Sequence, residues 1–307
     1  MPKPPLPWTL GHGQAFALTV VAFFFISTAG VVTRHLHTQV PFEITFWRSA
    51  FAAAALVLAW RAFGARQRAT PVPWRSRMLW ASALCWAVMF TAFMLALMLT
   101  SVANALITLA LGPLITALVS SLVLRHRLRW RTWGAMGLAG LGVTWMFGQA
   151  VHLQDQQALV GMAVALAVPL AAALQWNVLH QSHHVAAGAT PLLPSVMLGA
   201  TLSAVFTLPM AWPLQASAPD VAALALLGMF QLALPCAVLV WVARVLSPTE
   251  LGLLALLELV FGIGLTWLGA GEAPTAHAWV GGSLVLIALV LQQLGAPAQV
   301  TPQSSRP

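Results

Sequence analysis

The stretch MLWASALCWAVMFTAFMLALMLTSVANALITLALGPLITALVSSLVL, residues 78–124, decides the fold. It contains two apolar runs, 78–99 and 102–124, each close to the roughly 20 residues that a helix needs to cross a bilayer. Only Thr100 and Ser101 separate the two runs. Because so short a connection holds two helices side by side as an antiparallel hairpin, this stretch predicts two neighbouring membrane-spanning helices.

Further apolar runs of similar length fill most of the remaining chain. They are 14–33, 42–60, 132–149, 158–180, 191–213, 221–243, 249–270 and 277–294. Only 7% of the 307 residues are charged and 60% are hydrophobic, which leaves too few polar groups to cover a water-soluble domain of this length. Backbone in lipid must satisfy its own hydrogen bonds, and these runs lack the alternation of barrel strands. The sequence therefore predicts an all-α membrane protein with ten transmembrane helices.

The basic residues alternate from loop to loop along the chain. If the N-terminus is cytoplasmic, 12 of the 14 lysines and arginines fall on the cytoplasmic side, and Asp155, Asp220 and Glu272 fall in the opposite loops. Cytoplasmic loops are the ones enriched in Lys and Arg. The net charge of +8 therefore indicates membrane topology, with anionic lipid headgroups as partners, rather than binding of nucleic acid. We expect a multi-pass protein of the plasma (inner) membrane with both termini in the cytoplasm.

The two halves of the chain have similar hydrophobic patterns, as an internal repeat would. A shift of 146 residues aligns Ser101 with Ser247 and Trp133 with Trp279, and brings the hydrophobic boundaries into register. Each half contains five predicted helices, and an odd number of crossings turns the second half upside down relative to the first. The sequence predicts two inverted five-helix repeats, at 1–150 and 151–307, the second followed by a disordered C-terminal tail. Inverted repeats allow a central cavity to open first to one side and then to the other.

Short motifs, in order along the chain, resemble the helix starts, junctions and breaks of EamA-type members of the drug/metabolite transporter (DMT) superfamily. They are Pro41 to Arg48, Ala96 to Ala105, Gly112 with Pro113, Leu246 to Pro248, Glu258, and Gly271 to Pro274. The resemblance extends from about Ala15 to Leu291, with Leu259 where the family has a second proline. It implies ten helices in two inverted EamA-like repeats, with the fourth helix broken.

The same resemblance implies a secondary transporter that moves a small metabolite by alternating access, with an amino acid as one candidate substrate and export as the favoured direction. The alternative is a membrane-embedded enzyme acting on a lipid or peptide. The sequence lacks a His-Glu-x-x-His helix, paired intramembrane aspartates and a Gly-x-Ser-x-Gly elbow. We therefore expect no enzyme, no catalytic residues, no metal and no cofactor. The expected partners are a small-molecule substrate, the lipid bilayer, and protons as a candidate coupling ion.

Two charged residues fall inside predicted membrane helices. Arg48 lies roughly 9 Å below the outer end of its helix, where an uncompensated arginine costs at least about 2.5 kcal/mol. It is a candidate anchor for an anionic substrate group, or a structural tie to backbone carbonyls or to Glu43. Glu258 falls near the membrane midplane. It is a candidate for substrate binding and proton exchange, or a tie between helices.

Four further residues are candidates for lining the substrate site. Trp47 and Trp176 offer flat apolar surfaces, and Gln231 and Asn177 offer amides in otherwise apolar spans. Aromatic and amide groups in membrane bundles also serve as packing and interhelical ties. The cluster of His180, His183 and His184 lies near the cytoplasmic end of its helix, and its role is left open between a titratable loop and a metal site.

Overall fold

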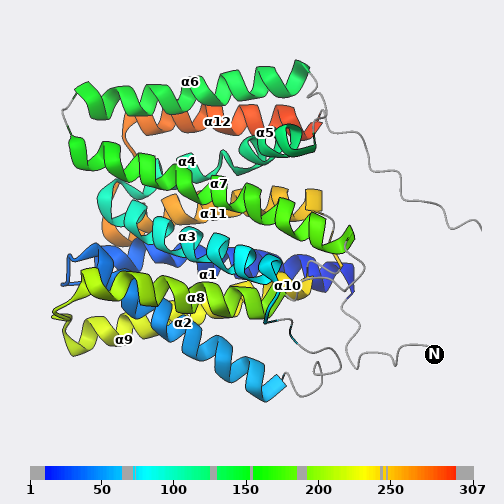
Figure 1. The fold of residues 1–307 in the computed structure, drawn as a ribbon. Coiled ribbons are helices and arrows are strands. Elements are labelled where there is room, and N and C mark those ends of the chain that lie inside the picture. Colours follow the sequence, from blue (N-terminus) through cyan, green and yellow to red (C-terminus); the bar gives the residue numbers. More distant parts are fainter. Residues whose placement is uncertain are drawn as a thin grey trace, which may run out of the picture.

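The computed structural model describes residues 11–63, 72, 74–124, 130–152, 155–184, 192–242, 245–246 and 248–294, which form a bundle of long helices (Figure 1). The helices of the first half are α1 (His12–Arg34), α2 (Pro41–Phe63), α3 (Arg77–Leu99), α4 (Val102–Leu109), α5 (Gly112–Leu124) and α6 (Trp130–His152). Those of the second half are α7 (Gln156–His184), α8 (Leu192–Ala211), α9 (Ala218–Leu226), the π-helix η1 (Leu227–Ala233), α10 (Leu234–Val242), α11 (Pro248–Ala270) and α12 (Ala276–Leu294).

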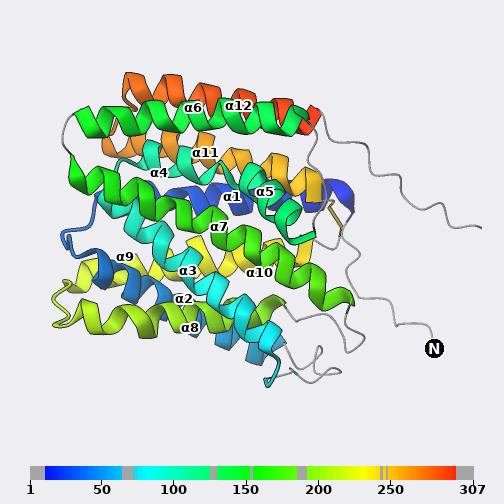
Figure 2. The same cartoon turned by 45° about the horizontal axis from the view of Figure 1, so that its top comes forward.

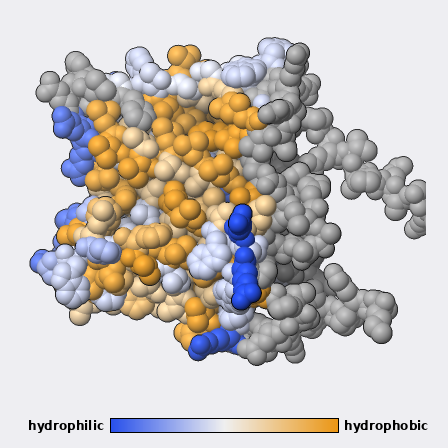
Figure 3. Space-filling model, in the orientation of Figure 1, coloured by the Kyte–Doolittle hydropathy of each residue, from blue (hydrophilic) through white to orange (hydrophobic). Residues whose placement is uncertain are grey.

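The ten predicted spans are all observed as helices, with ends within a few residues of the predicted ones. Within the described ranges, seven helical stretches are long and apolar enough to cross a membrane by length and composition, and two shorter apolar ones belong to α11 and α12. Hydrophobic residues cover the middle of the visible face, and strongly hydrophilic residues gather toward its two sides (Figure 3). These features confirm an all-α membrane protein.

The fourth span is broken into α4 and α5, as the family resemblance implies. Pro113 has no backbone N–H to offer to the carbonyl of Leu109, and α4 ends at Leu109. The corresponding residue of the second repeat is Leu259, and α11 continues through it without a break. The two repeats therefore differ where the second proline is missing.

The eighth span is continuous but changes its winding in the middle. Between α9 and α10 lies η1, at whose end the N–H of Leu234 donates to the carbonyl of Met229, five residues earlier. Pro235 follows directly and cannot donate to the carbonyl of Gln231. The disturbance of the helix at this proline takes the form of a π segment. Such segments occur often at functional sites.

The contacts between helices come in pairs that the predicted repeat relates to each other. In the predicted repeat, α1 corresponds to α7, and the broken span α4–α5 corresponds to α11. The contact of α1 with α11 therefore has its counterpart in the contact of α7 with α4 and α5. Likewise, α2 corresponds to α8, and α3 corresponds to the span of α9, η1 and α10, so the contact of α3 with α8 has its counterpart in that of α9 and η1 with α2. The contacts of α2 with α8 and of α6 with α12 each join a helix to its own counterpart. The start of α1 at His12 and the end of α12 at Leu294, next to the two ends of the described chain, lie at one end of the bundle (Figure 1).

The charged loops follow the predicted division into two sides. Arg61 and Arg77 lie at the bundle end that holds His12 and Leu294, and Asp220 and Glu272 lie at the opposite end. The cytoplasmic location of the first end and the plasma membrane as the site of the protein stay predictions, as does the division at residue 150. The predicted disordered tail falls on residues 295–307, which lie outside the described residues.

The helices α6 and α12 lie side by side at one edge of the bundle in both views (Figure 1, Figure 2). A Cβ added to Gly142 would stand 2.5 Å from the carbonyl oxygen of Gly281, and a Cβ on Gly281 would stand equally close to the carbonyl oxygen of Gly142. Only the absence of side chains at both positions permits this approach, which is how small residues bring membrane helices together.

Candidate functional site

Arg48 is the centre of a buried polar cluster. It belongs to α2, and none of its surface is exposed. Its Nη1 donates to Oε1 of Gln231 in η1 at 3.0 Å, and its Nη2 donates to the carbonyl of Phe90 in α3 at 2.8 Å. The ring of Phe93 lies 5.8 Å from Cζ. The guanidinium thus contacts helices of both repeats.

Gln231 extends the cluster to α1. Its Nε2 donates to the carbonyl of Ile26 at 3.2 Å, so that one amide connects Arg48 to the backbone of α1. The closeness of η1 to α2 depends on Gly228, where an added Cβ would stand 2.5 Å from the carbonyl oxygen of Arg48. The π segment and this glycine together place the amide of Gln231 against the guanidinium.

A second set of polar side chains includes Ser49, the residue that follows Arg48 in α2. Ser203 of α8 forms hydrogen bonds with Ser49 of α2 at 2.9 Å and with Thr91 of α3 at 2.8 Å. Thr91 follows the residue whose carbonyl accepts from Arg48. The polar cluster therefore lies where α2 and α3 of the first repeat meet α8 and η1 of the second.

Glu258 of α11 lies at the same level of the bundle as Gln231. Ser27 of α1 donates to the backbone carbonyl of Glu258 at 3.2 Å, and the preceding residue, Ile26, accepts from Gln231. The Glu258 side chain is half-buried, and among the described residues its carboxyl forms no hydrogen bond with Arg48. The structure thus brings Glu258 near the cluster without joining it to the guanidinium.

The remaining predicted site residues divide into two groups. Trp47 is half-buried beside Arg48 and stacks on Phe51 at 5.8 Å between ring centroids, and its indole Nε1 has no hydrogen-bond partner among the described residues. The side chains of Trp176 and Asn177 lie outside the described residues, although their backbone belongs to α7. The same holds for the cluster His180, His183 and His184.

The charge of Arg48 has no ionic partner within the part of the chain that the structure describes. Both acceptors of its hydrogen bonds are neutral oxygens, and its Nε has no partner there. Glu43, one of the ties considered from the sequence, instead accepts from the backbone N–H groups of Gln215 and Ala216, both at 2.7 Å to Oε1. The guanidinium is therefore a buried cation whose described hydrogen-bond acceptors are an amide oxygen and a backbone carbonyl, both uncharged.

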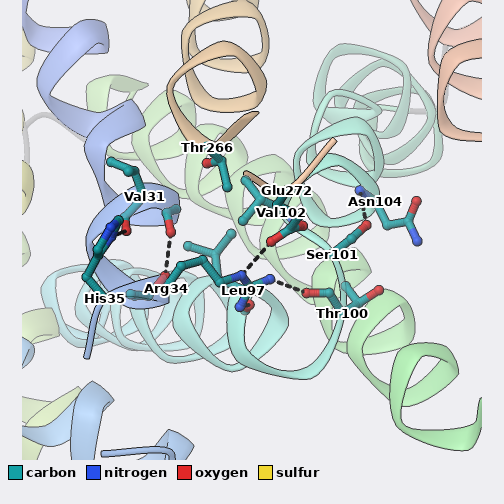
Figure 4. Close-up of polar contacts among 12 residues, drawn as sticks. Val31, Arg34, His35, Leu97, Thr100, Ser101, Val102, Asn104, Thr266 and Glu272 are labelled. Carbon is teal, nitrogen blue, oxygen red and sulfur yellow. Dashed lines mark hydrogen bonds and ion pairs between the residues drawn. The ribbon is translucent and has the colours of Figure 1, made fainter. Parts of the chain in front are cut away.

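Arg34 and Glu272 form a second cross-repeat cluster, which the sequence did not reveal (Figure 4). The Nε of Arg34 pairs with Oε2 of Glu272, and Nη1 and Nη2 donate to the carbonyls of Leu97 and Thr100 at 2.8 and 2.9 Å. The Oε1 of Glu272 accepts from the N–H of Val102 at 2.7 Å. The cluster joins the end of α1, the junction of α3 with α4, and the loop after α11.

A third carboxylate ties the same end of the bundle. Asp220 of α9 is buried and accepts from the backbone N–H groups of His37 at 3.1 Å and Thr38 at 2.9 Å, in the loop between α1 and α2. Glu43 of α2 binds the loop before α9 in return. Each of these two helices therefore holds the loop that precedes the other.

The bundle of apolar helices, with a buried cation where its two halves meet, is that of a polytopic membrane protein. Residues 14–148, which comprise nearly all of α1 to α6, match the model of the EamA-like transporter family. Through this match, which covers less than half of the 307 residues, the first half of the chain is similar to membrane transporters of small solutes, consistent with the DMT superfamily.

Two further comparisons were made with curated proteins and with solved structures. No curated protein matches the chain. A solved structure described only as the crystal structure of a protein is similar over 92% of this chain and 98% of its own, with 18% identity and a TM-score of 0.61. At that identity the similarity shows the fold alone. The shared fold covers both halves of the chain.

Proposed function

We propose that this protein is a secondary transporter that moves a small metabolite with a carboxylate or similar anionic group across the membrane by alternating access. The observation that supports the proposal is the fully buried guanidinium of Arg48, whose described hydrogen-bond acceptors are both neutral. Ionisable groups at membrane depth are costly and commonly mark solute pathways. The match of residues 14–148 to the EamA-like transporter family favours a transporter over the membrane-embedded enzyme that was the alternative.

The geometry of Arg48 suits a carboxylate. A guanidinium offers five N–H groups in a planar fork, and a carboxylate takes two of them side by side. In the described structure Gln231 and Phe90 take one N–H from each terminal nitrogen, and Nε has no partner. An arriving carboxylate would use the free edge of the fork and supply the negative charge that the surrounding dipoles lack.

The other candidate residues take supporting roles in this proposal. The free indole N–H of Trp47, beside Arg48, would donate to a polar group of the solute. Glu258 would bind a positively charged solute group or a coupling proton, which is consistent with an amino acid as substrate. Trp176 and Asn177 would line the same site from α7, and export would be the direction of transport.

Solute counterflow in vesicles reconstituted with the full chain tests the proposal. Pairs of small metabolites that differ only in having a carboxylate or a carboxamide are compared. We expect exchange of the carboxylate member of at least one pair, no exchange of its carboxamide, and loss of exchange in Arg48→Ala. The matched control is Arg61→Ala, which removes the same charge from the exposed end of the same helix. Equal exchange of both members, or full activity of Arg48→Ala, would contradict an anion site at Arg48.

A further inference from the structure

A cavity of about 260 Å³ lies at the end of the bundle opposite to the described chain ends. It is lined by residues of α1, the loop that follows it, and α9, namely Val31, Val32, His35, Leu36, His37, Pro219, Asp220 and Ala223. His35, His37 and Pro219 are exposed, whereas Leu36 and Asp220 are buried. The lining is therefore open to water at His35, His37 and Pro219, and its buried part includes both an apolar side chain and the carboxylate of Asp220.

The two helices that line this cavity also lead to the Arg48 cluster. Along α1, Ile26 lies five residues deeper than Val31, or roughly 8 Å at the rise of an α-helix. Along α9 and η1, Gln231 lies eight residues beyond Ala223, or roughly 12 Å. Below the cavity, α1 packs against η1 and α10. The helices thus converge on the hydrogen bond of Gln231 with the carbonyl of Ile26.

Two of the polar ties around the cavity hold its walls to different parts of the bundle, and a third, from the backbone of His37 and Thr38 to Asp220, joins the walls to each other. Arg34 fastens the end of α1 to the α3–α4 junction and to the loop after α11. Glu43 holds α2 to the loop before α9. The wall formed by α1 is therefore anchored to one set of helices, and the wall formed by α9 is anchored to α2. Separation of α1 from α9 and η1 would leave the ties of Arg34 and Glu43 intact, and it would break the bonds of Asp220 to the loop after α1 and the bond of Gln231 to Ile26.

We infer that this cavity is the vestibule of the solute path on the side opposite to the chain ends, and that the Gln231–Ile26 hydrogen bond is the barrier between it and Arg48. The inference rests on the proposed transport function. Drug-sized ligands occupy pockets of roughly 300–1,000 Å³, so a cavity of about 260 Å³ suits a smaller solute.

Thiol labelling of single-cysteine additions tests this inference in the full chain. Ala223→Cys places a thiol on the cavity wall, and Ala222→Cys places one on the exposed face of the same helix. The native Cys85 and Cys236 stay in place, and labelling of the parent protein measures how far these two thiols react with the reagent. A charged, membrane-impermeant methanethiosulfonate is added from each side of the vesicles in turn, and labelling and solute flux are measured.

The expected result is labelling of Ala223→Cys only from the side opposite to the chain ends, with loss of flux and with slower labelling when solute is present. Ala222→Cys should keep its flux after treatment. Val32→Cys, on the facing wall, should behave like Ala223→Cys, so the test survives if one variant fails to fold. Failure of both cavity thiols to label from that side would overturn the inference.

The failure of this inference differs from the failure of the proposed function. Absence of solute flux in the parent contradicts the proposed function. Flux in the parent that persists in labelled Ala223→Cys contradicts only the vestibule, because the solute then passes elsewhere.

Discussion

The guanidinium of Arg34 and the carboxylate of Glu272 lie 2.5 Å apart between Nε and Oε2, and they join the end of α1 to the loop after α11. Both side chains are about a quarter exposed, at 25% and 24%. Each also binds the backbone of the α3–α4 junction, Arg34 through two carbonyls and Glu272 through one N–H. One ion pair thus holds helices of both repeats together at one end of the bundle.

Arg34→Ala should lower the stability of the protein by about 1–3 kcal/mol, because three charge-assisted contacts are lost in a partly screened site. Thermal unfolding in detergent measures the loss. A double-mutant cycle with Glu272→Gln should show coupling, with the double variant less destabilised than the sum of the single ones. Strictly additive effects would mean that the two side chains act independently.

Gln231→Glu should abolish carboxylate exchange while the protein still folds. The new carboxylate would occupy the place of an amide that already accepts from Arg48 and would satisfy its charge from within the protein. Counterflow and thermal stability, measured together, check this. Gln231→Leu is the companion variant, because it removes the acceptor without adding charge. Undiminished exchange in Gln231→Glu would show that the charge of Arg48 is not used to bind solute.

Glu258→Gln should remove any dependence of solute accumulation on the pH gradient while leaving binding at Arg48. The amide keeps the size of the carboxyl but cannot exchange a proton at physiological pH. Accumulation is measured in vesicles with and without a pH gradient, in the parent and in the variant. If the parent is itself insensitive to the gradient, Glu258 does not couple protons to transport.

Gly142→Ala should destabilise the contact of α6 with α12 by about 1–3 kcal/mol, because the added Cβ would stand 2.5 Å from the Gly281 carbonyl oxygen and force the helices apart. Gly140→Ala is the matched control two residues away, where nothing lies within 4 Å of the added atom. It should be neutral or slightly stabilising, since alanine has a higher helix propensity than glycine. Equal thermal stability of the two variants would contradict the close crossing.

Most of the fold could be predicted because its main determinant is local. Apolar runs of bilayer length mark the spans, and connections as short as Thr100–Ser101 force antiparallel neighbours. The break after Leu109 followed from Gly112 and Pro113 through the family resemblance. The π winding of η1 could not be read from Pro235, since a proline at mid-helix is compatible with a kink, a break or a wider turn.

The site was predicted as separate residues rather than as an arrangement. Arg48 and Gln231 were both expected to matter, but their hydrogen bond joins residues 183 positions apart across two repeats. No spacing in the sequence encodes such a contact. Glu43 lies close to Arg48 in sequence, yet its Oε1 binds the loop before α9. Arg34 and Glu272 gave only a weak signal, as charged residues in loops on the side that is otherwise poor in arginine.

Hydrophobicity and charge are properties of short segments, and therefore the number of spans, their inverted order and the two-sided distribution of arginines follow from the order of residues alone. The pairing of buried polar groups depends on which helices face each other and on where each residue lies along the bundle axis. Close approaches at glycines, such as that of Gly228 to α2, set those heights. Tertiary packing, and not any local pattern, therefore placed the Arg48 guanidinium against Gln231 and left the Glu258 carboxyl apart from it.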